Sequence, residues 1–211
     1  MTLGSALFGF ALVAALLTII PGLDSALVVR SALSRSKTYA FVTALGIQSG
    51  VLIWGVAAGV GATAILAASQ FAYQVITILG AAYLVVMGIM MLVSSFRGSA
   101  HSAEPVQTPP GGALRGFVVG LFTNLLNPKI GVFYLATIPQ FMAAGVPPYL
   151  MGLMLALVHC VLGMVWFSLL IFGGSALSSK LKSASFVRWV DRVTGGILIA
   201  FGAKLALDAR V

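Results

Sequence analysis

Residues 3–33, LGSALFGFALVAALLTIIPGLDSALVVRSAL, decide the class of fold to which this chain belongs. No charged side chain occurs before Asp24, and the apolar run is long enough to cross a bilayer, which takes about 20 helical residues. A secretory signal would begin with a basic segment, but no Lys or Arg precedes Leu3. We therefore predict a retained membrane-spanning helix that is interrupted at Pro21-Gly22.

The composition of the whole chain extends this prediction. Of the 211 residues, 60% are apolar and 8% are charged, whereas a soluble domain carries roughly 25% charged residues. Further apolar stretches predict spans over 39–67, 71–95, 113–138, 148–176 and 186–207. The fourth span is interrupted near Asn127-Pro128. The fold class is thus an all-α integral membrane protein with six transmembrane helices.

The basic residues indicate how the spans are oriented. The net charge is +8, from twelve Lys and Arg against four acids. The links between spans one and two, three and four, and five and six contain Lys or Arg, whereas the other two links contain none. The positive-inside rule then places the basic links in the cytoplasm and both termini outside. Because the basic residues follow this membrane pattern, we expect no nucleic-acid partner.

The two interrupted spans open two blocks of three. Pro21 is followed by Asp24, and Pro128 is followed by Lys129. Because three is an odd number, the second block is inverted relative to the first, and broken helices at matching places of inverted repeats indicate a transporter binding site. The predicted units are repeat one over 1–96, a cytoplasmic loop over 97–112 and repeat two over 113–211, in one domain over 1–211.

Asp24 and Lys129 are the charged candidates for that site. A helical rise of 1.5 Å per residue places both at a similar depth in the membrane, where a charge is costly and is usually kept for a task. Asp24 could hold a substrate ammonium or a coupling proton, or it could cap the half-helix that restarts after the first break. Lys129 could hold a substrate carboxylate, or it could be a structural ion-pair partner or a snorkelling lysine.

Polar groups near the two interruptions complete the candidate site. A proline frees carbonyls of the preceding turn, and the N-terminus of a half-helix offers N–H donors to an anion; an ordinary kink is the alternative. The Asn side chains could bond the broken backbone or a ligand, and the mid-span His could relay protons or belong to the core. The candidate residues for substrate binding and coupling are Asp24, Lys129, Pro21, Gly22, Pro128, Asn127, Asn124, Gln48 and His159.

Several enzyme motifs are missing from the sequence. It contains no Gly-rich phosphate loop ending in Lys and Ser or Thr, no His-Glu-x-x-His and no acid cluster spaced for a metal. The one cysteine, Cys160, cannot form an internal disulfide. We expect no enzyme, no cofactor and no metal site. We interpret the other acids as loop or span-end residues: Glu104, Asp191 and Asp208.

Two further features bear on packing between helices. Gly55 and Gly59, four residues apart, permit close approach of another helix in lipid. The contact could lie inside the chain or in a homodimer. The expected partners are therefore the lipid bilayer, a small-molecule substrate and, as an open alternative, a second copy.

Three segments of the sequence carry a further signal. They are Pro21-Gly-Leu-Asp24 with Arg30, Arg35 and Ala44–Gly50; Asn124-Leu-Leu-Asn-Pro-Lys129 with Phe133 and Pro139-Gln-Phe141; and Gly195–Gly202. Together they resemble the LysE/RhtB amino-acid exporter family, and the resemblance covers essentially the whole chain. It implies export of amino acids or close derivatives across the bacterial inner membrane, driven by the proton-motive force, with Asp24, Pro21 and Pro128 in the transport core. The family commonly has Pro-Gly-Pro before its acid, where this chain has Leu23 at the second proline.

The predicted function is therefore a secondary active exporter of small amino acids. No second buried acid is visible to bind a basic side chain, which favours neutral substrates. The alternatives are a cation exporter of the same broad superfamily, a channel, and a non-transporting membrane subunit. In the last case Asp24 and Lys129 would be a structural pair, and replacing both with apolar residues would be tolerated.

Overall fold

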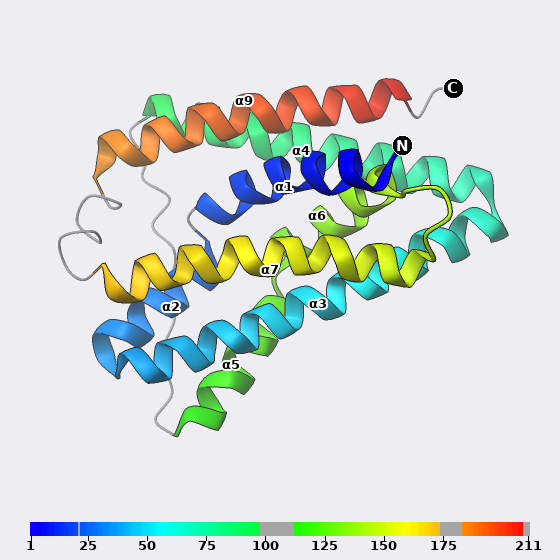
Figure 1. The fold of residues 1–211 in the computed structure, drawn as a ribbon. Coiled ribbons are helices and arrows are strands. Elements are labelled where there is room, and N and C mark those ends of the chain that lie inside the picture. The colour runs from blue at the N-terminus through cyan, green and yellow to red at the C-terminus, as the bar shows by residue number, and fades with distance from the viewer. Residues whose placement is uncertain (21, 98–111, 174–182, 209–211) are drawn as a thin grey trace.

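The computed structural model describes residues 1–20, 22–97, 112–173 and 183–208, and within these ranges the chain is helical without any strand (Figure 1). This agrees with the predicted all-α class. Most of the predicted polar loop over 97–112 lies outside the described residues, as do 174–176 at the predicted end of the fifth span.

Both predicted interruptions are present as sharp bends. Helices α1 (Leu3–Ile19) and α2 (Leu23–Ser34) meet at 54°, and α5 (Ala113–Leu125) meets the segment Pro128–Phe141 at 56°. That segment consists of α6 (Pro128–Thr137) and the 3₁₀ helix η1 (Ile138–Phe141). The structure therefore bends each broken span where the sequence predicted an interruption.

Local chemistry explains where the second half-helices begin. The side chain of Asn127 accepts a hydrogen bond of 3.1 Å from the Lys129 backbone N–H and so caps α6. Pro128 occupies the first turn, where its missing N–H costs nothing. At the first break, Gly22 adopts an extended backbone before α2; Pro21 lies outside the described residues.

The unbroken helices match the other predicted spans to within a few residues at their described ends. Ser36 caps the first of them by accepting a hydrogen bond of 3.1 Å from the Tyr39 backbone N–H. The helices are α3 (Lys37–Ala68), α4 (Gln70–Arg97), α7 (Pro148–Phe172) and α9 (Ala184–Asp208).

The number of membrane crossings is supported in part. Among the described residues, α3, α4 and α7 are long and apolar enough to cross a membrane, and the total reaches five if each bent pair is one span. Helix α9 is long enough but carries several charges, at Arg188, Asp191, Arg192, Lys204 and Asp208. The sixth span therefore stays a prediction.

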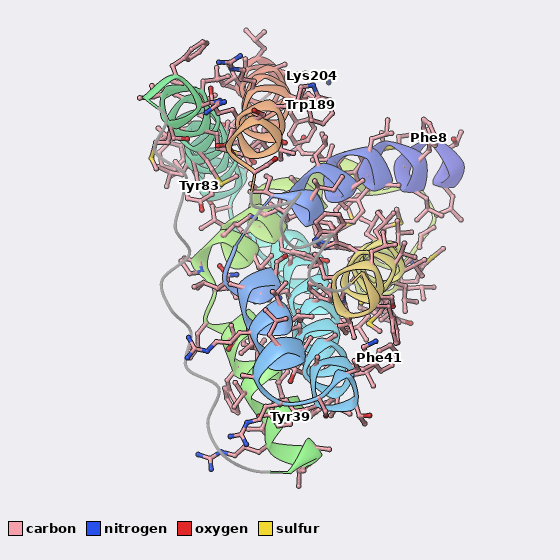
Figure 2. The ribbon with its side chains drawn as sticks, turned by 90° about the vertical axis from the view of Figure 1, so that its left-hand side faces the viewer. Phe8, Tyr39, Phe41, Tyr83, Trp189 and Lys204 are labelled. Atoms are coloured by element: carbon pink, nitrogen blue, oxygen red, sulfur yellow. The ribbon has the colours of Figure 1, made fainter. Side chains whose placement is uncertain are left out.

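Large apolar side chains cover the outer surface of the bundle. Phe8, Phe41 and Trp189 point outward in Figure 2, and 68% of Phe8 and 62% of Trp189 are exposed. Exposed apolar side chains of this kind match a surface that faces lipid rather than water.

Glycines bring pairs of helices into backbone contact. A methyl group at Gly55 would lie 2.6 Å from the Gly152 carbonyl oxygen of α7, and one at Gly59 would lie 3.2 Å from the Gly152 Cα. Gly55 and Gly59 therefore serve a contact inside the chain. In the same way, a methyl at Gly88 of α4 would lie 2.6 Å from the Gly195 carbonyl oxygen of α9, and these two helices run side by side (Figure 1).

The buried apolar side chains form two clusters. The larger one includes an aromatic group of Phe10, Phe133, Tyr134 and Phe141, in which the Phe10 and Phe141 rings lie 5.6 Å apart edge to face. The smaller one gathers apolar side chains of α2, α3 and α7. The polar cavity described next takes lining residues from both clusters, so it lies between them.

Candidate functional site

A cavity of about 40 Å³ lies where the two helix breaks meet α3 and α7. That volume would hold roughly three water molecules. Its lining mixes charged, amide and apolar side chains from both halves of the sequence. The lining residues are Leu17, Thr18, Ile20, Gly22, Asp24, Ser25, Ile47, Gln48, Val51, Asn127, Lys129, Ile130, His159, Gly163 and Phe167.

The Asp24 carboxylate is held by two amides from the other half of the chain. The Asn124 Nδ2 donates to Asp24 Oδ2 at 2.8 Å, and the Asn127 Nδ2 donates to Asp24 Oδ1 at 3.4 Å. Asn124 is completely buried in the last turn of α5. Asp24 also lies in the first turn of α2, where the partial positive charge of a helix N-terminus favours an anion.

The Lys129 ammonium is held by backbone carbonyls at the end of α1. Its Nζ donates to the Leu17 and Ile20 carbonyl oxygens, each at 3.4 Å. The Leu17 carbonyl would ordinarily bond the N–H four residues later, but that residue is Pro21, which has none. Gly22 lies beside the amine, since a methyl group there would be at ordinary contact distance, 3.4 Å, from Nζ.

Asp24 and Lys129 thus share the cavity without touching. Within the part of the chain that the structure describes, the two side chains form no ion pair, and every hydrogen bond of either group goes to the opposite break. The arrangement is crossed, since the acid of the first break binds amides of the second and the lysine of the second binds carbonyls of the first. A direct structural ion pair, one alternative for Lys129, is not formed in this arrangement.

The remaining polar candidates come from the unbroken helices. Gln48 of α3 lines the cavity and is 6% exposed. His159 of α7 also lines it, and the His159 Nδ1 lies 2.9 Å from the Tyr134 hydroxyl, with the two rings stacked. Pro128 lies at the start of α6 and is not among the lining residues.

Sequence reasoning missed two features of this region. Tyr134, the hydrogen-bond partner of His159, is fully buried in α6. Gly163 lies one helical turn after His159 and so faces the cavity as well, which the spacing of four residues could have indicated. Outside this region, Asp191, interpreted from the sequence as a loop or span-end residue, lies near the start of α9. It is a second buried acid, outside the cavity lining, and accepts a hydrogen bond of 3.5 Å from the Ser94 hydroxyl of α4.

The described residues contain no group of three His, Cys, Asp or Glu side chains that could hold a metal ion. What the cavity offers instead is a carboxylate, an ammonium group, amides and an imidazole within a largely apolar wall. Groups of both charges at one place suit a small zwitterion, whose own ammonium and carboxylate can pair with them.

Comparison with known proteins shows similarity along nearly the entire chain. The sequence profile of the LysE type translocators matches residues 15–209. The uncharacterized membrane protein YrhP of Bacillus subtilis is 29% identical over 204 residues, covering 93% of this chain and 96% of that protein. The threonine efflux protein of Escherichia coli K12 is 28% identical over 188 residues, covering 89% and 91%.

A third relative is also named as an efflux protein. The homoserine/homoserine lactone efflux protein of Salmonella typhimurium is 27% identical over 199 residues, covering 94% of this chain and 95% of that protein. No solved structure matches the chain.

Proposed function

The chain belongs to the LysE type translocator family, and from this premise we propose that it is a secondary active exporter of small amino acids or close derivatives. The proposal places it in the bacterial inner membrane with the proton-motive force as its energy source. The observation that carries it is the crossed pair of Asp24 and Lys129 in a cavity between two broken helices.

The chemistry of the cavity supports a neutral amino acid as substrate. In the proposal, Asp24 holds the substrate ammonium or carries the coupling proton, and Lys129 holds the carboxylate together with the N-terminus of a half-helix. Asn124 and Asn127 orient Asp24 through their amide hydrogen bonds. Relatives named for threonine and for homoserine efflux, both small neutral amino acids, favour the same class.

The cavity must widen before a substrate of this kind can bind. A threonine molecule occupies more space than the roughly three waters that fit the present volume. Because Lys129 and Asp24 each bridge the two breaks, a bound zwitterion would replace those bridges and let the breaks separate. Such a change is a way to couple occupancy to alternating access.

Two inverted three-helix repeats in one domain would provide that motion. The similar bends of 54° and 56° support this part of the proposal, and so does the pairing of the matching helices, α3 with α7 and α4 with α9. The start of α1 and the end of α9 also lie at the same end of the bundle (Figure 1), as an even number of crossings requires. With the basic links in the cytoplasm, that end is the external one.

The test is amino-acid release from bacteria that overexpress this chain and are loaded by feeding dipeptides. We expect release of one or a few neutral amino acids above the vector control, and loss of that release in Asp24→Asn. Asp208→Asn, at the last residue of α9 and outside the cavity lining, is the matched control and should export normally.

Other outcomes would select among the alternatives. Normal expression without excess release of any amino acid would refute amino-acid export and direct attention to cation efflux or a subunit role. Equal release by the parent and Asp24→Asn would support amino-acid export but refute the proposed role of Asp24 in substrate binding or proton coupling.

A further inference from the structure

The side chain of Gln48 is buried in the cavity wall and has no hydrogen-bond partner among the residues that the structure describes. It is 6% exposed and comes from the middle of α3. Within the described part of the chain its Oε1 accepts no hydrogen bond, and no other bond to its carboxamide is formed. Buried polar groups in proteins are nearly always paired. An unpaired carboxamide beside a cavity is therefore available to form hydrogen bonds with a ligand.

A glycine on the facing helix leaves the space that this carboxamide occupies. A methyl group at Gly163 of α7 would collide with Gln48 Nε2 and would lie 3.2 Å from both Cδ and Oε1. The amide therefore lies across Gly163, where a larger residue would displace it. The next residue, Ser49, is different, since its hydroxyl donates to the Leu45 carbonyl at 3.0 Å and it does not line the cavity.

Gln48 lies on different helices from the charged groups. Asp24 and Lys129 come from the broken helices, whereas Gln48 and Gly163 come from α3 and α7 and are surrounded by apolar lining residues, among them Ile47, Val51 and Phe167. The charged groups of an amino acid are joined to one carbon atom, and its side chain points away from them. A substrate held by Asp24 and Lys129 would then present its side chain to the wall that contains Gln48.

We propose that Gln48, lying across Gly163, is the residue that recognises a hydroxyl group on the substrate's side chain. This inference rests on the proposed function and deepens it, because it selects small hydroxyl-bearing amino acids over apolar ones of the same shape. A carboxamide both donates and accepts, and so does a hydroxyl, so the pair can form with either orientation of the amide. An apolar side chain would leave the carboxamide unpaired, and the site discriminates against it for that reason.

Threonine and valine are suitable probes because they differ only by a hydroxyl in place of a methyl group. Purified protein in liposomes that contain unlabelled amino acid would be assayed for counterflow of labelled threonine and labelled valine. We expect threonine to be preferred by the parent about tenfold, the discrimination that one hydrogen bond provides. Gln48→Leu should reduce the preference to about unity by lowering threonine counterflow. The matched control Ser49→Ala should keep the parental preference.

Gly163→Ala gives a second variant in which Gln48 remains but is displaced, and it too should lose the preference. Equal counterflow of threonine and valine by the parent would overturn the inference, and this result needs no variant to fold. An unchanged preference in folded Gln48→Leu, checked by its elution as a single species in detergent, would overturn it as well. Absence of counterflow of every amino acid by the parent would instead refute the proposed function.

Discussion

Removing the charges of Asp24 and Lys129 singly and together separates their structural role from the role in transport that we propose for them. Lys129→Met deletes two hydrogen bonds of 3.4 Å to α1 carbonyls. Bonds of that length are weak, so we assign about 0.5–1 kcal/mol to each and about 1–2 kcal/mol in total. For a chain of this size the melting temperature would fall by roughly 2–8 °C.

Asp24→Asn should cost more. It removes the charge from the acceptor of the 2.8 Å bond donated by Asn124, and a hydrogen bond to a charged group contributes about 1.5–3 kcal/mol. The melting temperature would then fall by roughly 3–12 °C. Each single change leaves one charge in the cavity without its counterpart, so the double variant should be more stable than the sum predicts, by about 1 kcal/mol.

The assays are thermal unfolding in detergent, followed by tryptophan fluorescence, and amino-acid counterflow in liposomes. All three variants should lose counterflow, including the double variant whose stability is partly regained. Lys204→Gln, an exposed lysine of α9 outside the cavity lining, is the control and should keep full counterflow. A double variant that folds and transports at the parental rate would refute the site, and strictly additive losses of stability would refute the electrostatic coupling.

Other parts of the structure give three further predictions. Gly88→Ala should lower the melting temperature by several degrees, because overpacking costs about 1–3 kcal/mol, whereas Gly196→Ala, which meets no described atom within 4 Å, should not; equal stabilities would contradict the close α4–α9 contact. Tyr134→Phe removes the 2.9 Å bond to its histidine partner and should cost about 1 kcal/mol by thermal unfolding, and an unchanged melting temperature would argue against that bond. In a cysteine-free background, Ala144→Cys should react with an impermeant maleimide on whole cells and Thr38→Cys only after permeabilisation, and the reverse pattern would refute the proposed orientation.

The helices and their breaks could be predicted because each depends on local sequence. Apolar runs give the spans, and Asn127-Pro128 supplies both the cap and the first residue of α6. The depth of Asp24 and Lys129 in the membrane, taken from helical rise, stays a prediction. What each charge binds could not be predicted, because the partners lie about 100 residues away, as Asn124 does from Asp24. Those contacts depend on how the broken helices rotate and bend relative to one another, which no apolar pattern specifies.

The same limit explains why the burial of Asp191 was missed. This acid was visible near the start of an apolar stretch, but a helix has several faces, and only tertiary packing decides which of them is buried. Gly163 illustrates the point, since it matters because it has no side chain where the Gln48 amide lies.

The crossed bonds of Asp24 and Lys129 have a consequence for how this chain can be divided or can diverge. Among the described residues, the acid of the N-terminal half has its side-chain hydrogen-bond donors in the C-terminal half, and the lysine of the C-terminal half has its acceptors in the N-terminal half. Neither half alone contains all the groups of the proposed site, so a half exchanged for that of a relative must bring compatible groups at the other break. A substitution at one break would therefore favour a compensating substitution at the other, and we expect the two breaks to covary among relatives.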